Sequence, residues 1–157
     1  RMNAPATEDE RLERANGLEA LLAPCLKCHE LDAGRVRMAP VRIAEAFADQ
    51  VERSAEKKMV FVSSTQGSIA EGTVPVFAYC SSKAALNKCV AMTALAVKSR
   101  GIVATAVCPG HVRTELGGQG ATLEPADSVA NLRRLIARLA PGDSGAFIRH
   151  DGTRVAW

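Results

Sequence analysis

The sequence predicts an α/β fold built around a parallel β-sheet. Residues 59–62 and 102–108 are short, continuous apolar runs, which is typical of strands that are covered on both faces. The segment between them is long enough for a helical crossover, and such crossovers join parallel strands. Long stretches with helical apolar spacing precede, separate and follow the two runs. This alternation indicates βαβ units.

Two helices are expected before the first strand. Residues 7–23 begin with a capping-box pattern and continue with an apolar stripe, so they predict an amphipathic helix. Residues 24–39 are expected to be irregular. Pro40 then begins a second helix that runs to about Lys57, because proline is favoured in the first helical turn and apolar residues recur four apart after it.

The rest of the chain predicts two more helices and a turn. From about Phe77 to Lys98 the sequence lacks Gly and Pro and is apolar nearly all round, which predicts a buried helix. Pro125 begins a helix with apolar residues on one face. Near the end of the chain, Asp151-Gly152 lies between two short extended runs, which is a hairpin signal.

The composition is that of an ordinary globular protein of one domain. Hydrophobic residues make up 47% of the 157 residues and charged residues 24%. The 20 Lys and Arg exceed the 17 Asp and Glu by 3 without forming a basic block, and aromatic residues make up only 4%. We therefore expect no nucleic-acid partner and no membrane association. No apolar run has the length of a membrane span or a secretory signal.

The five cysteines favour a reducing compartment. Their number is odd, and three of them lie in apolar runs, which suits buried thiols better than a disulfide framework. We expect a cytoplasmic protein. The chain begins with Arg1 and not with methionine, so we also expect that a longer protein contains an upstream segment.

Tyr79 and Lys83 are the first candidates for catalysis. On a helix, residues four apart share a face, about 5 to 6 Å apart at Cβ. A cation close to a phenol favours its ionised form, which suits a general acid and base working near neutral pH. The alternative is a half-buried tyrosine at a helix start, with a lysine that extends its charge to solvent.

Polar residues also follow both predicted strands. Ser64 comes just after the first apolar run, and ligands of open parallel sheets bind beyond the carboxyl ends of the strands. A serine there can donate a hydrogen bond to a carbonyl oxygen that gains charge. The second run ends in C-P-G-H-V-R-T, which is otherwise an ordinary Pro-Gly turn.

This order of motifs resembles the short-chain dehydrogenase/reductase family. The resemblance is closer to its C-factor-like, carbonyl-reductase branch, through S-S-T-Q-G-S-I, Y-C-S-S-K-A-A-L-N, P-G-H-V-R-T-E-L-G-G and S-G-A-F-I-R-H-D-G-T-R-V-A-W. It covers about residues 36–157 and implies part of a doubly wound, Rossmann-like sheet. Residues 1–35 resemble nothing in the family, so we expect them to be a separate segment of unclear origin.

The resemblance implies a reaction and its residues. Ser64 would hold the substrate carbonyl, Tyr79 would be the acid and base, and Lys83 would favour the phenolate and bind the nicotinamide ribose. The nicotinamide end of NAD or NADP would be lined by Pro109, Gly110, Val112 and Thr114. The substrate would be a small carbonyl compound or alcohol, since hydride transfer belongs to the cofactor. A homodimer or homotetramer is also implied, through the helices at 40–57 and 79–98.

Parts of the family pattern are missing. A dinucleotide site needs a Gly-rich turn at a helix N-terminus, and before residue 60 the only glycines are Gly17 and Gly34. The asparagine of the family's catalytic tetrad falls on Val36. We therefore expect weak NAD(P) binding and doubtful activity of this chain by itself. The alternative is a non-catalytic, C-factor-like signalling or interaction module.

A third hypothesis concerns Cys25-Leu26-Lys27-Cys28-His29. C-x-x-C-H is the attachment pattern of c-type haem, in which two thiols bond the vinyl groups and the histidine ligates iron. The chain would then be a haem segment fused to a dehydrogenase remnant, with Met38 or Met59 as sixth ligand. Two loop cysteines beside a solvent-facing histidine are the simpler alternative. Zinc is less well supported, because no second pair of ligands has useful spacing.

Overall fold

A computed structural model of the chain describes residues 34–73 and 75–157, with the backbone alone for residues 34–38. Residues Ala39–Trp157 form one compact unit. The predicted helix at 7–23 and the Cys-x-x-Cys-His segment lie outside the described residues. The division of the chain at residues 35 and 36 stays a prediction.

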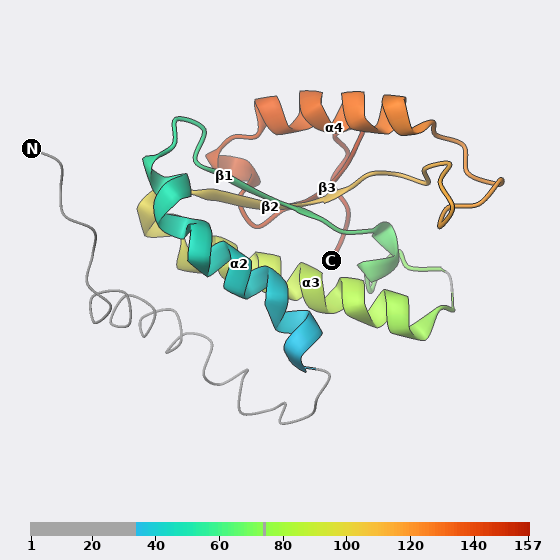
Figure 1. Cartoon of the computed structure of the whole chain (residues 1–157), viewed down its shortest axis with the longest axis horizontal. Helices are drawn as coiled ribbons and strands as arrows, with labels where there is room; N and C mark the ends of the chain where they lie inside the picture. The colour runs from blue at the N-terminus through green and yellow to red at the C-terminus, as the bar shows by residue number, and fades with distance from the viewer. Residues whose placement is uncertain (1–33, 74) are drawn as a thin grey trace, which may run out of the picture. The chain divides into compact units, whose positions relative to one another are not determined.

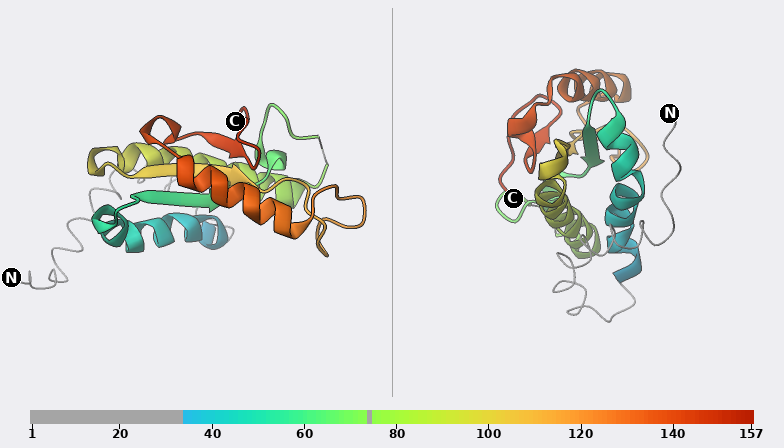
Figure 2. Two further views of the ribbon diagram at one scale, coloured as in Figure 1. Left: turned by 90° about the horizontal axis from the view of Figure 1, so that it is seen from above. Right: turned by 90° about the vertical axis from the view of Figure 1, so that its left-hand side faces the viewer.

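The sheet has three parallel strands in the order β1-β2-β3, which are Lys58–Val62, Val103–Cys108 and Phe147–Arg149. Lys58 is paired with Val103 and Ala106 with Phe147. The predicted parallel pairing of the two apolar runs is therefore confirmed. Helix α4 covers one face of the sheet, and helices α2 and α3 lie on the other (Figures 1 and 2). Strand β2 is buried along its whole length, as a strand between two helical layers should be.

The helices are α2 (Gly34–Arg53), α3 (Phe77–Ala96) and α4 (Pro125–Arg138), with short 3₁₀ helices η1 (Thr65–Gly67), η2 (Lys98–Arg100) and η3 (Pro141–Asp143). The start expected for α2 is wrong, because the helix begins at Gly34 and contains Pro40. A proline inside a helix removes one backbone hydrogen bond and can bend the helix without ending it.

The burial expected for α3 is also wrong. Only Asn87, Val90, Thr93 and Ala94 are buried along the helix, while Leu95 remains 66% exposed. The sequence is apolar nearly all round, but one sheet face covers only one side of a helix. The apolar face expected for α4 is only partly buried: Leu135 and Leu139 are buried, while Val129 is 55% exposed.

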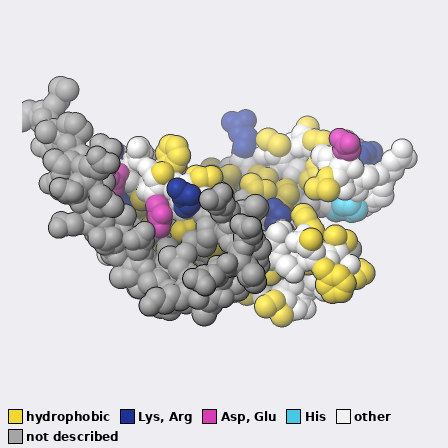
Figure 3. All heavy atoms as spheres, turned by 60° about the horizontal axis from the view of Figure 1, so that its bottom comes forward, with side chains coloured by type: hydrophobic (Ala, Val, Ile, Leu, Met, Phe, Trp, Pro, Cys, Tyr) yellow, Lys and Arg dark blue, Asp and Glu magenta, His cyan; other side chains and the backbone are white. Residues whose placement is uncertain are grey.

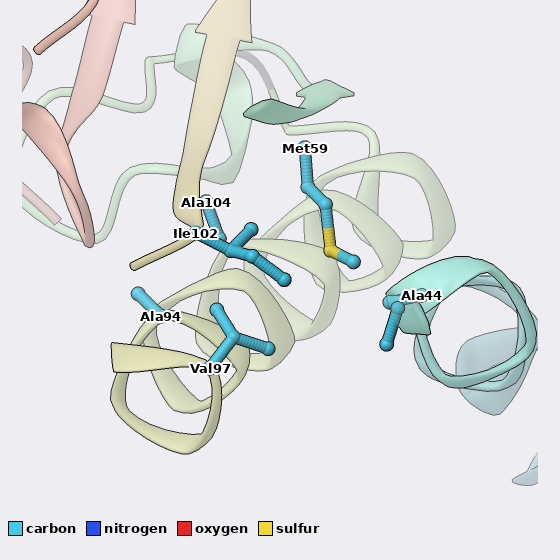
Figure 4. Close-up of a cluster of buried hydrophobic side chains, with 7 residues drawn as sticks. Ala44, Met59, Ala94, Val97, Ile102 and Ala104 are labelled. Carbon is cyan, nitrogen blue, oxygen red and sulfur yellow. The ribbon is translucent and has the colours of Figure 1, made fainter. Parts of the chain in front are cut away.

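One core cluster lies between the sheet and the two helices on its lower face. Figure 4 shows Met59, Ile102 and Ala104 of the sheet layer pointing toward Ala94 and Val97 of the α3 region, with Ala44 of α2 beside Met59. Small alanines on both helices let them approach the strands closely. Arg100 holds the C-terminal end of α2 through ion pairs with Asp49 and Glu52, both at 2.6 Å.

The opposite face carries a second cluster, in which Leu135 and Leu139 of the α4 region pack on Val103, Val107 and Ile148 of the sheet. The Nζ atom of Lys58 donates hydrogen bonds to the carbonyl oxygens of Ile136 (2.9 Å) and Ala137 (3.0 Å). A lysine in this place satisfies carbonyls that the helix end leaves open. None of the described helices is both long and apolar enough to cross a bilayer.

The predicted turn at Asp151-Gly152 is confirmed. Arg149 N–H donates to Thr153 O and Val155 N–H donates to Phe147 O, both at 2.8 Å, so residues 153–155 run back along β3. The Asp151 carboxylate accepts from the Thr153 N–H at 2.8 Å and from its hydroxyl at 2.7 Å. These two hydrogen bonds lower the pKa of Asp151. The chain itself therefore covers the outer edge of β3.

Candidate active site

Ser64 lies two residues after the end of β1, where it caps the short helix η1. Its Oγ accepts a hydrogen bond from the Gln66 N–H at 3.2 Å, and its own backbone is extended. A serine is well suited to this place because its oxygen satisfies an amide that the helix start leaves open. The cap holds the serine at the carboxyl end of the strand.

Tyr79 and Lys83 lie one turn apart at the start of α3. The Lys83 Nζ atom is 5.8 Å from the centre of the Tyr79 ring, so the two side chains share a face, as their spacing predicts. The same Nζ atom donates to the Val62 carbonyl oxygen at 3.3 Å. Lys83 therefore links the tyrosine to the end of β1, close to the start of the segment that contains Ser64.

Gly67 brings the Ser64 segment against α3. A Cβ atom at this position would lie 2.6 Å from the backbone C of Lys83 and 2.7 Å from its Cβ. No side chain fits there without moving backbone. The close approach explains why a glycine follows S-S-T-Q, a signal that is present in the sequence but that spacing alone does not interpret.

Gly67→Ala should separate η1 from α3 and so disturb Ser64 and Lys83 together. We expect a loss of about 1 to 3 kcal/mol in unfolding free energy, the usual cost of overpacking. Gly142→Ala is the matched control, since a Cβ there would meet no atom within 4 Å. Urea unfolding of both variants measures the difference. Equal stabilities would contradict the close packing at Gly67.

A buried hydrogen bond fixes the end of β1 to the middle of α3. The Ser63 hydroxyl donates to Asn87 Oδ1 at 2.5 Å, and both residues are almost fully buried. Asn87 Nδ2 is also buried and has no hydrogen-bond partner among the described residues. Buried amide donors are normally satisfied, and the described residues supply no acceptor for this one.

The predicted cofactor-lining residues follow β2. Gly110 has a φ of +86°, a left-handed conformation that favours glycine. A Cβ at Gly110 would lie 2.7 Å from His150 Cδ2, so the turn packs closely on the imidazole. The Ser128 hydroxyl donates to the Pro109 carbonyl oxygen at 2.7 Å and ties the turn to α4. Spacing does not predict either contact.

Val112 and Thr114 belong to a loop that returns on itself. Val112 forms a bridge with Leu123, and the Thr114 hydroxyl donates to Val112 O at 3.4 Å and accepts from Gly117 N–H at 3.2 Å. This loop and the Ser64 segment both follow the carboxyl ends of neighbouring parallel strands. The structure thus places the predicted residues at the carboxyl ends of the strands. Their roles stay a prediction.

The described residues fit one end of a dinucleotide better than the other. A lysine ammonium, a phenol and a serine hydroxyl are suitable partners for a ribose and a carbonyl oxygen. A pyrophosphate needs free amides at a helix N-terminus. The glycine-rich residues 117–120 precede α4. The N-cap of that helix is Glu124, which brings a carboxylate, and its first residue is Pro125, which has no N–H. The N-terminus of α4 therefore offers no pyrophosphate cradle.

Several hydrophobic side chains are exposed before and at the start of α3, the helix that contains Tyr79. Figure 3 shows them gathered at the surface over the start of α3, where Ile69, Val76 and Phe77 are 89%, 51% and 84% exposed. Leu116, in the loop after β2, is 85% exposed as well. Isolated apolar side chains are common on surfaces, whereas groups of them are more frequent at binding sites.

The segment after η1 is fastened to the end of the chain. Glu71 pairs with Arg149 of β3, and its Oε1 accepts from the Ala156 N–H at 2.9 Å. The Ser68 hydroxyl donates to the Ala156 carbonyl oxygen at 2.6 Å. The hydrogen bond from Ala156, followed by the one from Arg149, lowers the pKa of Glu71. Sequence spacing gives no sign of these contacts, because the partners lie far apart in the chain.

Lowering the pH should therefore weaken the contacts of Glu71 that fasten the segment after η1 to the end of the chain. Since the pKa of Glu71 is lower in the folded state, its contribution to stability is fully present above its ordinary value of 4.5 and is lost as the pH falls through the folded value. We expect Glu71→Gln to be less stable than the parent at pH 7 and to differ less from it at pH 3. Thermal melts at both pH values test this. A constant difference between the two proteins would contradict it.

Comparison with known proteins connects the geometry to a family. The model of the short chain dehydrogenase family matches residues 37–122. C-signal of Myxococcus xanthus is 36% identical over 121 residues, which are 76% of this chain and 73% of that protein.

Solved structures give the same result. The NADPH-bound carbonyl reductase from chicken fatty liver is 30% identical with a TM-score of 0.67, and the match covers 76% of this chain and 53% of that one. The carbonyl reductase Sniffer of D. melanogaster, at 24% identity, shares the fold with a TM-score of 0.72 over 100% of this chain and 60% of its own. The chain thus spans little more than half of these solved relatives.

Proposed function

Because the chain belongs to the short-chain dehydrogenase family, we propose that it carries the substrate half of a carbonyl-reductase site. The single observation that supports this best is the arrangement of Lys83, whose ammonium reaches both the Tyr79 ring and the carboxyl end of β1. General acid catalysis needs the acid within hydrogen-bond reach of the reacting oxygen. A substrate oxygen bound beside the Tyr79 hydroxyl, at the carboxyl end of β1, would satisfy that condition.

In this proposal the chain's own residues bind, orient and protonate the substrate. Ser64 donates a hydrogen bond to the carbonyl oxygen while negative charge grows on it. Tyr79 then gives its proton to that oxygen, and Lys83 stabilises the phenolate that remains. NADPH or NADH supplies the hydride when bound. Its nicotinamide end would meet Pro109, Gly110, Val112 and Thr114.

The substrate class is inferred from the surface beside these residues. Ile69, Phe77 and Leu116 are largely exposed there, and the charged side chain that faces the Tyr79 ring is Lys83. Apolar carbonyl compounds would cover this surface, because burying apolar area contributes about 25 cal/mol per Å². The reverse reaction would oxidise the matching alcohols.

An NADPH fluorescence titration, followed by reduction of a reactive diketone, tests the proposal. We expect weak binding, since the sequence before residue 60 lacks the Gly-rich turn that holds a pyrophosphate, and slow turnover that depends on Tyr79. Binding and turnover with NADPH but not with NADH would identify the preferred cofactor. No binding and no turnover of the intact chain would contradict the proposal.

A second candidate function is non-catalytic. C-signal of Myxococcus xanthus bears a name that indicates signalling, and the match covers 73% of its length. The lack of a Gly-rich pyrophosphate turn before residue 60 favours a family member that acts by binding another molecule. The self-association implied by the family resemblance belongs here, and the exposed Leu95 on α3 is consistent with it. Sedimentation of the chain at micromolar concentration tests that expectation.

A further inference from the structure

The proposed site has two halves that lie on different elements. Ser64 follows strand β1, whereas Tyr79 and Lys83 lie on helix α3. Groups that act on one substrate oxygen have to be held within about 0.5 Å of their working positions. The position of the first turns of α3 relative to the end of β1 therefore decides whether the two halves can act together.

The first turns of α3 have few contacts that fix them. Within residues 77–86, all of which the structure describes, no side chain is fully buried. The N-cap residue Val76 makes no side-chain hydrogen bond to the helix start. Helix ends with few buried contacts open more readily than packed ones. Tyr79 and Lys83 lie in this stretch, so contacts to other elements have to set their position.

Asn87 is the first buried residue along α3. It lies one turn after Lys83 and two turns after Tyr79, so the three residues share one face of the helix. Its side chain is 3% exposed, and its Oδ1 atom accepts the hydrogen bond from the Ser63 hydroxyl at 2.5 Å. The face that carries the two candidate catalytic residues is thus attached to the strand end through Asn87.

Ser63 is itself held by the sheet. Its N–H donates to Val107 O at 2.8 Å, which continues the pairing of β1 with β2. Its two neighbours in the chain both belong to the site. Val62 O accepts from Lys83 Nζ at 3.3 Å, and Ser64 is the candidate for carbonyl binding. A single buried side chain, between these two neighbours, therefore connects the strand end to α3.

A hydrogen bond fixes position in a way that apolar packing does not. Its length varies by only a few tenths of an ångström and its strength depends on angle, whereas apolar contact is non-directional. Val90 and Ala94, further along α3, belong to apolar clusters. Burial of an amide costs free energy, and Asn87 Nδ2 has no partner among the described residues. A positioning role explains an asparagine here better than stability does.

We propose that Asn87 is a positioning residue of the site. Its hydrogen bond with Ser63 sets the axial position and the rotation of α3, and thereby the places of Tyr79 and Lys83 relative to Ser64. Asn87 acts through these residues and not on the substrate. Its effect on catalysis rests on the proposed function, whereas its effect on geometry can be measured without turnover.

The first test is NMR of the full chain. Tyr79 is the only tyrosine, so its ring signals are unambiguous, and Lys83 Nζ lies 5.8 Å from the ring centre. A shift of about 1 Å, which can cost about 100-fold in rate, would weaken the nuclear Overhauser effect between the ring and the lysine methylene beside Nζ about twofold. We expect this loss in Ser63→Ala and in Asn87→Ala. The double variant should lose no more, because both changes remove the same bond.

Two further variants separate positioning from stability. Ser63→Thr keeps the hydroxyl and should keep the parent signal. The Thr105 hydroxyl, fully buried in β2, donates to Asp143 O at 2.9 Å. Thr105→Val should lower the unfolding midpoint, as loss of the Asn87 bond does, but leave the ring-to-lysine signal unchanged. An unchanged signal in Ser63→Ala and Asn87→Ala would overturn the proposal, and so would equal weakening in Thr105→Val.

Turnover gives the second test. If the parent reduces a diketone with NADPH, kcat of Asn87→Ala should fall about tenfold to 100-fold, with KM changed by less than about twofold. A parent kcat in a variant whose ring-to-lysine signal is weakened would also overturn the proposal. If no protein turns over, the proposed function fails, and the NMR comparison alone then decides whether Asn87 positions the helix.

Discussion

Tyr79→Phe is expected to reduce any carbonyl reduction by this chain by about 10² to 10⁴, the usual contribution of a positioned acid and base. The change removes one oxygen and keeps the ring, which is half-buried at the start of α3 and faces the Lys83 ammonium at 5.8 Å. Stability should therefore change little. The measurement is the rate of NADPH oxidation with a reactive diketone, together with the unfolding midpoint of both proteins.

Ser82→Ala is the matched control for this experiment. The Ser82 hydroxyl is exposed and donates to the Tyr79 carbonyl oxygen at 2.7 Å, so the variant changes the same helical turn without touching the phenol. It should keep the parent rate. Equal rates for the parent and Tyr79→Phe would exclude the tyrosine mechanism. If neither protein shows activity, the non-catalytic interpretation is favoured, because the sequence before residue 60 lacks the Gly-rich turn that holds a pyrophosphate.

Phe147→Ala should have the largest effect on stability, about 3 to 5 kcal/mol. Phe147 is 1% exposed and packs in a cluster with Val90, Ala106 and Val155. Its ring also stacks on that of Trp157, with 5.5 Å between the centroids. Truncation leaves a cavity between the sheet and α3 and removes the partner of the last residue. Urea unfolding at neutral pH measures the loss.

Phe77→Ala separates this effect from the general cost of losing an aromatic ring. Phe77 is 84% exposed at the start of α3, so its truncation should stay within about 0.5 kcal/mol of the parent. A loss at Phe147 no larger than the loss at Phe77 would show that β3 and the C-terminal residues are not packed as described. Loss of the tail contacts at Ala156 should accompany the Phe147 effect.

Local patterns in the sequence were sufficient for strands β1 and β2, for the existence of helices α2, α3 and α4, and for one part of the candidate site. Strands β1 and β2 follow the two continuous apolar runs, and their parallel pairing follows from the helix between them. Tyr79 and Lys83 share a face because they are four residues apart on a helix, which needs no tertiary information. The position of Ser64 in the site follows from its place just after the predicted end of β1.

The two errors arose where neighbours outweigh local preference. Pro40 favours a helix start, but the helix continues through it, and one lost hydrogen bond is a cost that the rest of α2 can offset. The apolar sequence of α3 suggests burial all round, but burial depends on how many elements surround a helix. The described part of this fold covers only one of its sides.

Only the tertiary structure could show the contacts that support the site. Gly67 touches Lys83, Ser63 donates to Asn87, and Glu71 pairs with Arg149, which is 78 residues away in the chain. Periodicity reports which residues share a face within one element, since neighbours on a helix or strand have fixed offsets. Contacts between elements depend on how the chain closes its loops and packs its layers. Sequence spacing carries no record of those distances.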